Sequence, residues 1–173
     1  MVEAVSGAAV LSDAFGRIHE AFHGVTAGLD PAALEYQPDP ESNSIAWLLW
    51  HLTRVQDDHV AAAFGSEQIW TSQGWHLRFA LPFEPEANGY GMEPKDVAAV
   101  RVDSPALLTD YHDAVYAQTA RFLERLADAE LDRIVDERWD PPVTLGVRLV
   151  SVVEDDLQHV GQAAYLRGVF ERR

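Results

Sequence analysis

The chain is dominated by four segments in which apolar residues recur every three or four positions. They cover roughly residues 8–29, 44–64, 104–126 and 144–170. This spacing puts the apolar side chains on one face of an α-helix, and that face needs another element to pack against. Proline and glycine interrupt the chain between the segments, and we find no alternating pattern long enough to predict a strand. The pattern therefore predicts an all-α fold, a four-helix bundle.

The connection between the second and third segments is longer than the others. Its prolines and glycines exclude a long helix between residues 66 and 103, although residues 94–100 can form a short one. The same stretch contains five large aromatic residues: Trp70, Trp75, Phe79, Phe83 and Tyr90. Disordered segments are poor in such side chains. We therefore expect an ordered, aromatic-rich connection between helices 2 and 3 that packs over one end of the bundle.

Composition narrows the classes of function. The length of 173 residues fits a single domain over residues 1–173. The net charge of −15 opposes binding to nucleic-acid phosphates. The chain has no cysteine, which excludes disulfides, thiolate metal sites and a cysteine nucleophile. Residues 1–20 lack the features of a signal peptide, and no apolar run reaches membrane-spanning length. We expect a cytoplasmic protein without nucleic-acid or membrane partners.

Three ionisable side chains fall at positions predicted to face the interior. Asp155 and His159 are four residues apart on the fourth helix and therefore leave the same face. His51 lies among apolar inward positions of the second helix. Ligands from facing helices are how bundles build metal sites, and three protein ligands leave a coordination position open, as in catalytic zinc sites. The inward stripe predicted on the fourth helix is Val152, Asp155, His159, Gln162 and Leu166.

The same residues also have a metal-free interpretation. A single buried histidine is most often a core residue with a hydrogen-bond partner, and Asp155 and His159 can form an ordinary helix pair worth a few tenths of a kcal/mol. His51 would then be the partner that a buried carboxylate requires. The residues alone leave both interpretations open. If a metal binds, this donor set suits Zn²⁺, and also Ni²⁺, Fe²⁺ or Mn²⁺.

The motifs around these residues resemble those of the DinB/YfiT-like superfamily. They are SIAWLLWHL at residues 44–52 and DDLQHVGQAAYLRG at residues 155–168. In that superfamily a histidine on the second helix and an H-x-x-x-H-x-G-Q motif on the fourth bind a divalent metal. The resemblance covers nearly the whole chain and implies that His51, Asp155 and His159 are the metal ligands. A carboxylate at the first motif position is similar to the branch of mycothiol-dependent maleylpyruvate isomerase and related thiol S-transferases.

That branch implies a metal-dependent transferase, with zinc the first choice of metal. It would conjugate a low-molecular-weight thiol such as mycothiol to an electrophilic small molecule. Under this hypothesis Arg54 and Arg78 bind an anionic part of the thiol cofactor, and the aromatic connection covers the site. The superfamily also implies that the chain can form a homodimer. Two other functions stay open: a non-catalytic metal-binding stress or interaction protein, and a metal-dependent hydrolase.

The remaining polar residues have simpler predicted roles. His19 and His23 form a pair four residues apart on the first helix. Such a pair could bind adventitious metal, but we interpret it as a surface pair. Asp58 lies too far along the second helix from His51 to share an ion, since seven residues span about 10 Å. It is assigned at most a supporting polar role, and His59 is expected to be solvated. Gln162 either orients a ligand or hydrogen-bonds within the core.

Overall fold

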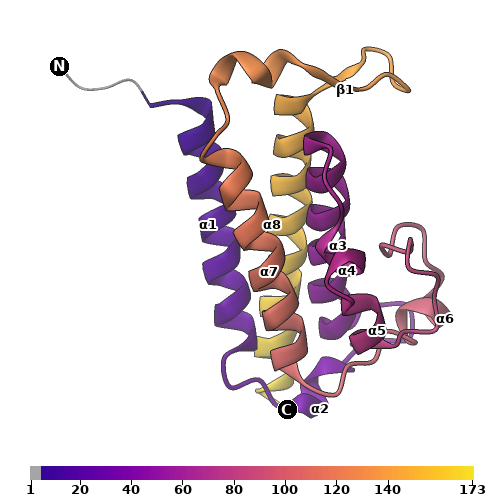
Figure 1. Ribbon diagram of the computed structural model, residues 1–173. Helices are drawn as coiled ribbons and strands as arrows, with labels where there is room; N and C mark the ends of the chain where they lie inside the picture. The colour runs from indigo at the N-terminus through magenta and orange to yellow at the C-terminus, as the bar shows by residue number, and fades with distance from the viewer. Residues whose placement is uncertain (1–4) are drawn as a thin grey trace.

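The computed structural model describes residues 5–173 and is predominantly helical (Figure 1). Its four long helices are α1 (Gly7–Thr26), α3 (Ile45–Phe64), α7 (Pro105–Leu123) and α8 (Leu145–Phe170). Their first residues lie within one position of the predicted starts. The reason is local, because a serine or threonine hydroxyl precedes each helix and accepts a backbone N–H of its first turn. The predicted helical class is therefore confirmed.

The four long helices lie side by side (Figure 1), and each packs against two of the others. Helix α3 contacts α8 and α7, and α1 contacts the same two helices. Helix α8 therefore lies between α1 and α3. The interface between α3 and α8 contains the candidate metal ligands described in the next subsection. In the described residues no helix combines the length and apolar character needed to cross a membrane.

Shorter elements occupy the connections. Helix α2 (Pro31–Leu34) precedes α3, and α4 (Ile69–Ser72), α5 (Trp75–Phe79) and α6 (Pro94–Val97) lie between α3 and α7. A 3-10 turn, η1 (Asp128–Asp132), leads into a small antiparallel pair of strands. These strands, β1 (Ile134–Asp136) and β2 (Val143–Thr144), were not predicted. They are too short to produce a recognisable alternation of apolar and polar residues.

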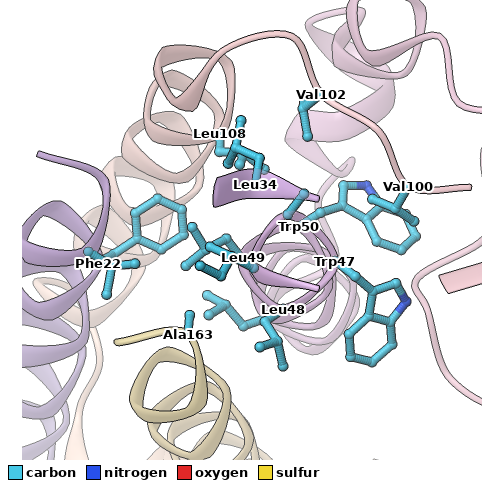
Figure 2. Close-up of a cluster of buried hydrophobic side chains, with 14 of the residues drawn as sticks. Phe22, Leu34, Trp47, Leu48, Leu49, Trp50, Val100, Val102, Leu108 and Ala163 are labelled. Atoms are coloured by element: carbon cyan, nitrogen blue, oxygen red, sulfur yellow. The ribbon is translucent and has the colours of Figure 1, made fainter. Parts of the chain in front are cut away.

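The core consists of two apolar clusters along the helices. The larger cluster holds Phe22, Leu48, Leu49 and Trp50, with Ala163 facing them from α8 (Figure 2). Three aromatic residues of the long connection are buried in the same cluster, namely Trp70, Trp75 and Phe79. Tyr90, from the same connection, is 91% exposed. The connection is thus fixed against the bundle at its tryptophans, while Tyr90 stays at the surface.

A buried carboxylate on α3 fastens the start of this connection. Asp57 accepts hydrogen bonds from the backbone N–H groups of Ile69 and Trp70, at 2.8 and 2.7 Å, and from the Tyr111 hydroxyl at 2.8 Å. Arg54, one turn earlier, lies 3.7 Å from the same carboxylate, and both side chains are fully buried. Removing one member would leave an unpaired buried charge, which is strongly destabilising.

Candidate metal centre

The three predicted ligands converge at the interface of α3 and α8. The rings of His51 and His159 are 4.9 Å apart between centroids. Asp155 Oδ1 lies 3.6 Å from His159 Nε2. One ligand atom from each of the three residues lies within 4.8 Å of the other two. His51 is buried and the other two are partly buried, so the structure brings the predicted group together at the edge of the core.

The hydrogen bonds of both imidazoles fix the tautomer that binds metal. His51 Nδ1 lies 2.5 Å from the carbonyl oxygen of Asn88, and His159 Nδ1 lies 2.9 Å from Gln162 Oε1. Each oxygen can only accept, so each Nδ1 carries the proton and donates it. The Nε2 atoms are left with free lone pairs. A ligating histidine that donates its other ring N–H to an oxygen is the usual arrangement around a protein-bound metal.

Asp155 also has a carboxylate oxygen that is free to bind a metal. Asp155 Oδ2 is buried and has no hydrogen-bond partner, and such a group costs about 1–3 kcal/mol if it stays unpaired. Burial lowers the pKa of His51, which favours the neutral, ligating form. The pKa of His159 is raised, because its contacts with Asp155 and Gln162 outweigh the opposing effect of burial. Two nitrogen donors and one unpaired carboxylate fit Zn²⁺ or a similar divalent cation.

A glycine lets the long connection cover His51. Gly89 has φ +99°, and a Cβ built on it would lie 2.4 Å from His51 Nδ1. Only glycine permits this close approach of the backbone. Its neighbour Asn88 donates from Nδ2 to Asp58 at 3.3 Å. Asp58 therefore holds the covering segment in place, which agrees with the supporting polar role predicted for it. Our sequence analysis missed Asn88 and Gly89. The Asn-Gly pair signals a turn, but nothing local shows what the turn packs against.

A cavity of about 670 Å³ opens beside His51 and Asp155. Its walls also include the aromatic rings of Tyr90 and Trp139 and the guanidinium group of Arg148. Tyr90 belongs to the aromatic connection that was expected to cover the site. The sequence analysis missed Trp139 and Arg148, because the β1–β2 hairpin and the start of α8 bring them close only in three dimensions. The arrangement provides space for a small molecule next to His51 and Asp155.

One carboxylate organises the basic wall of this cavity. Asp136 Oδ2 accepts from Arg148 and from Arg138, each at 2.9 Å. Hydrogen bonds from Arg138 hold the pKa of this carboxyl well below its usual range. Arg148 also lies 3.4 Å from His59 Nδ1. His59 lines the cavity and is half-buried, which corrects the expectation that it would be solvated.

The predicted cofactor ligands lie elsewhere. Arg54 is fully buried, and its guanidinium donates to the carbonyl oxygens of Pro85 and Ala87 and to the Gln68 side chain. Arg78 is exposed and lies over the Trp75 ring, 3.7 Å from its centroid. Neither arginine lines the cavity beside the three ligands. Arg54 therefore acts in packing, and a cofactor role for Arg78 stays a prediction.

The predicted inward stripe of α8 needs correction. Val152 and Leu166 are buried as predicted, and Asp156 and Val160 are buried with them, whereas Asp155 and His159 lie at the edge of this stripe. Gln162 is exposed and reaches back to His159. Steps of three and of four from Val152 lead to Asp155 and to Asp156, so spacing alone could not choose between them. Both oxygens of Asp156 are unpartnered, and burial raises the pKa of this carboxyl well above its usual value.

Comparison with known proteins identifies the family of this chain. Residues 14–163 match the sequence model of the DinB superfamily. The chain belongs to the DinB superfamily. Proteins of this superfamily often bind metal. The crystal structure of a conserved protein from Enterococcus faecalis is similar to this DinB protein, with a TM-score of 0.88 and 35% sequence identity over 95% of this chain and 96% of the other. No curated protein matches the chain.

Proposed function

We propose that this protein is a metal-dependent transferase that joins a low-molecular-weight thiol, such as mycothiol, to an electrophilic small molecule. The observation that carries the proposal is the meeting of two free imidazole Nε2 atoms and an unpaired carboxylate oxygen beside a cavity. His51, Asp155 and His159 would hold the cation, with zinc the first choice. A bound divalent cation supplies Lewis acidity, which lowers the pKa of a coordinating thiol.

The protein's own residues prepare the site for this chemistry. Asn88 and Gln162 hold the two imidazoles in the orientation that leaves Nε2 free. Three protein ligands would leave one coordination position open for a small molecule. The chain has no cysteine, so a reacting sulfur must come from a bound small molecule. The covering segment at Asn88 and Gly89 limits the access of water to His51 from that side.

The cavity wall supports a substrate with both apolar and anionic parts. Trp139 and Tyr90 offer aromatic faces. Arg138 and Arg148 both bind Asp136, and their guanidinium groups could hydrogen-bond an anionic group of a substrate, although Glu154 and Asp155 add negative charge to the same cavity. This pair would take the part first assigned to Arg54, which is buried away from the cavity. The four mutually packed long helices support a four-helix-bundle description, with the aromatic connection covering one side of the site.

The test is consumption of a model electrophile by the zinc-loaded protein. With 1-chloro-2,4-dinitrobenzene, the thiolate sulfur would replace chlorine at the ring carbon, chloride would leave and the thiol proton would pass to solvent. We expect this turnover only when both zinc and a thiol are present, with mycothiol compared against glutathione. Asp155→Asn should abolish turnover, because it removes the charge of the only anionic ligand. Asp110→Asn is the matched control, since it makes the same charge change on an exposed residue of α7.

The other outcomes separate the remaining functions. Hydrolysis of ester or amide substrates that needs zinc but no thiol would overturn the transferase proposal in favour of a hydrolase. Zinc binding without consumption of any electrophile would favour the non-catalytic metal-binding protein. Failure to retain any cation at His51, Asp155 and His159 would remove the basis of all three functions.

A further inference from the structure

A second group of metal-binding side chains lies outside this site, between α1 and α7. His19 and His23 leave the same face of α1, and Asp113 faces them from α7. The Nε2 atoms lie 2.8 Å (His19) and 2.7 Å (His23) from Asp113 Oδ1, and 3.2 Å from each other. All three residues are partly buried. The sequence analysis interpreted the two histidines as a surface pair, because Asp113 is distant in sequence.

The three atoms are close enough to one another to share one ion. Without a metal, both Nε2–H groups can donate to Asp113 Oδ1, because a carboxylate oxygen accepts more than one hydrogen bond. The third contact, 3.2 Å between the two nitrogens, is then not a hydrogen bond. A cation among the three atoms would instead turn all three contacts into contacts between ligands of one ion.

We propose that His19, His23 and Asp113 form a second divalent-cation site that ties α1 to α7. The distances fit such an ion. Metal–nitrogen and metal–oxygen bonds of about 2.0–2.2 Å place a cation about 1 Å out of the plane of the three atoms, within reach of each. Two imidazole donors select Zn²⁺, Ni²⁺ or Cu²⁺ over Mg²⁺ and Ca²⁺.

The packing holds this group in its converged arrangement. The His19 ring stacks on Tyr116 at 4.1 Å between centroids and lies 5.6 Å from the His112 ring, at a small interplanar angle in both cases. His112 is in turn buried and stacked on Phe22 at 4.1 Å. The ring of His19 therefore has little freedom to turn away from Asp113.

The second site differs in role from the first. None of its residues lines the cavity beside His51 and Asp155, and its ligands come from α1 and α7 rather than from α3 and α8. An ion that binds this group binds only the folded arrangement of the two helices, so it should raise the melting temperature. Its role is thus to stabilise the packing of α1 on α7.

The experiment measures zinc binding by equilibrium dialysis with elemental analysis, in the His159→Ala variant, which lacks a ligand of the first site. We expect one zinc ion per chain. Adding His23→Gln, or separately Asp113→Asn, should raise the dissociation constant of that ion at least about tenfold and remove the zinc-dependent rise in melting temperature. Glu20→Gln is the control for Asp113→Asn, because it removes one negative charge from an exposed position of α1, and it should leave binding within about twofold of the parent.

Two results would overturn the second site. One is a folded His159→Ala protein, verified by circular dichroism, that binds no zinc. The other is unchanged zinc binding in both His23→Gln and Asp113→Asn. Using two single variants keeps the test valid if one of them fails to fold. Zinc binding by the wild-type chain distinguishes the two sites. If only the site at His51, Asp155 and His159 fails to bind zinc, the chain still binds one ion, and His23→Gln weakens the binding of that ion.

Discussion

The two histidine and aspartate clusters have the same composition and different surroundings. Each combines two imidazoles and one carboxylate, with two members four residues apart on one helix and the third on a neighbouring helix. At the first cluster the nearest carboxylate oxygen of Asp155 lies 3.6 Å from His159 Nε2, and the group borders a cavity. At the second cluster the ligand atoms are already 2.7–3.2 Å apart.

This difference shows that the donor set does not by itself determine the role of a metal site. In the first cluster, Asn88 and Gln162 accept hydrogen bonds from the Nδ1 atoms of the two histidines. A neighbouring cavity offers space for another ligand. The second cluster lacks that cavity wall and joins two helices directly. We therefore assign chemistry to the first and stabilisation to the second.

The largest expected effect comes from His159→Ala. It removes one of three protein ligands from the first cluster, so zinc affinity there should fall by more than about 100-fold, beyond the effect of losing a supporting hydrogen bond. The helical circular dichroism spectrum should persist, because the long helices have their own apolar faces. Turnover should be lost while zinc at the second cluster is retained. Full zinc occupancy of the first cluster in this variant would show that its ligands are misassigned.

The next effect concerns the segment that covers His51. In Gly89→Ala the new methyl group would lie 2.4 Å from His51 Nδ1, so the segment must move and the Asn88 hydrogen bond must break. We expect zinc affinity at the first cluster to fall about 10–100-fold, measured by competition with a chelator.

Gly91→Ala is the matched control for this substitution. Gly91 also has a positive φ, +70°, but a Cβ there would have no neighbour within 4 Å. It should lose about 1–2 kcal/mol of stability from backbone strain and keep its zinc affinity. Equal loss of zinc affinity in the two variants would mean that contact with His51 is not the cause.

A smaller effect is expected for Gln162→Leu. The change removes the acceptor of the His159 Nδ1 proton and should weaken zinc binding at the first cluster about tenfold. Gln162 is exposed, so the free energy of unfolding should change by less than about 0.5 kcal/mol. Gln158→Leu, one turn earlier and also exposed, is the control. An unaltered affinity in Gln162→Leu would argue against a role of this hydrogen bond in metal binding.

The features that could be predicted from sequence are those set by local periodicity. The four long helices follow from apolar spacing and from their hydroxyl caps. Four-residue spacing shows that Asp155 and His159 share a helix face, but it does not show that Asp156 is the more deeply buried carboxylate. The tiny β1–β2 hairpin is too short to carry such a signal.

Contacts between distant parts of the chain could not be predicted in the same way. Asn88 contacts His51 across 37 positions, and Asp113 contacts His23 across 90. The burial of Arg54 depends on carbonyl groups more than 30 residues downstream. The sequence shows which residues can bind a metal, but only the packing of the helices and of the connection shows which of them meet.

The most direct test of the account is anomalous diffraction at the zinc edge, from crystals of the wild-type protein grown with zinc. We predict a peak within about 2.0–2.2 Å of His51 Nε2, His159 Nε2 and an Asp155 carboxylate oxygen, open on one side to the cavity. A map with zinc bound elsewhere and no peak among these three atoms would contradict the central claim.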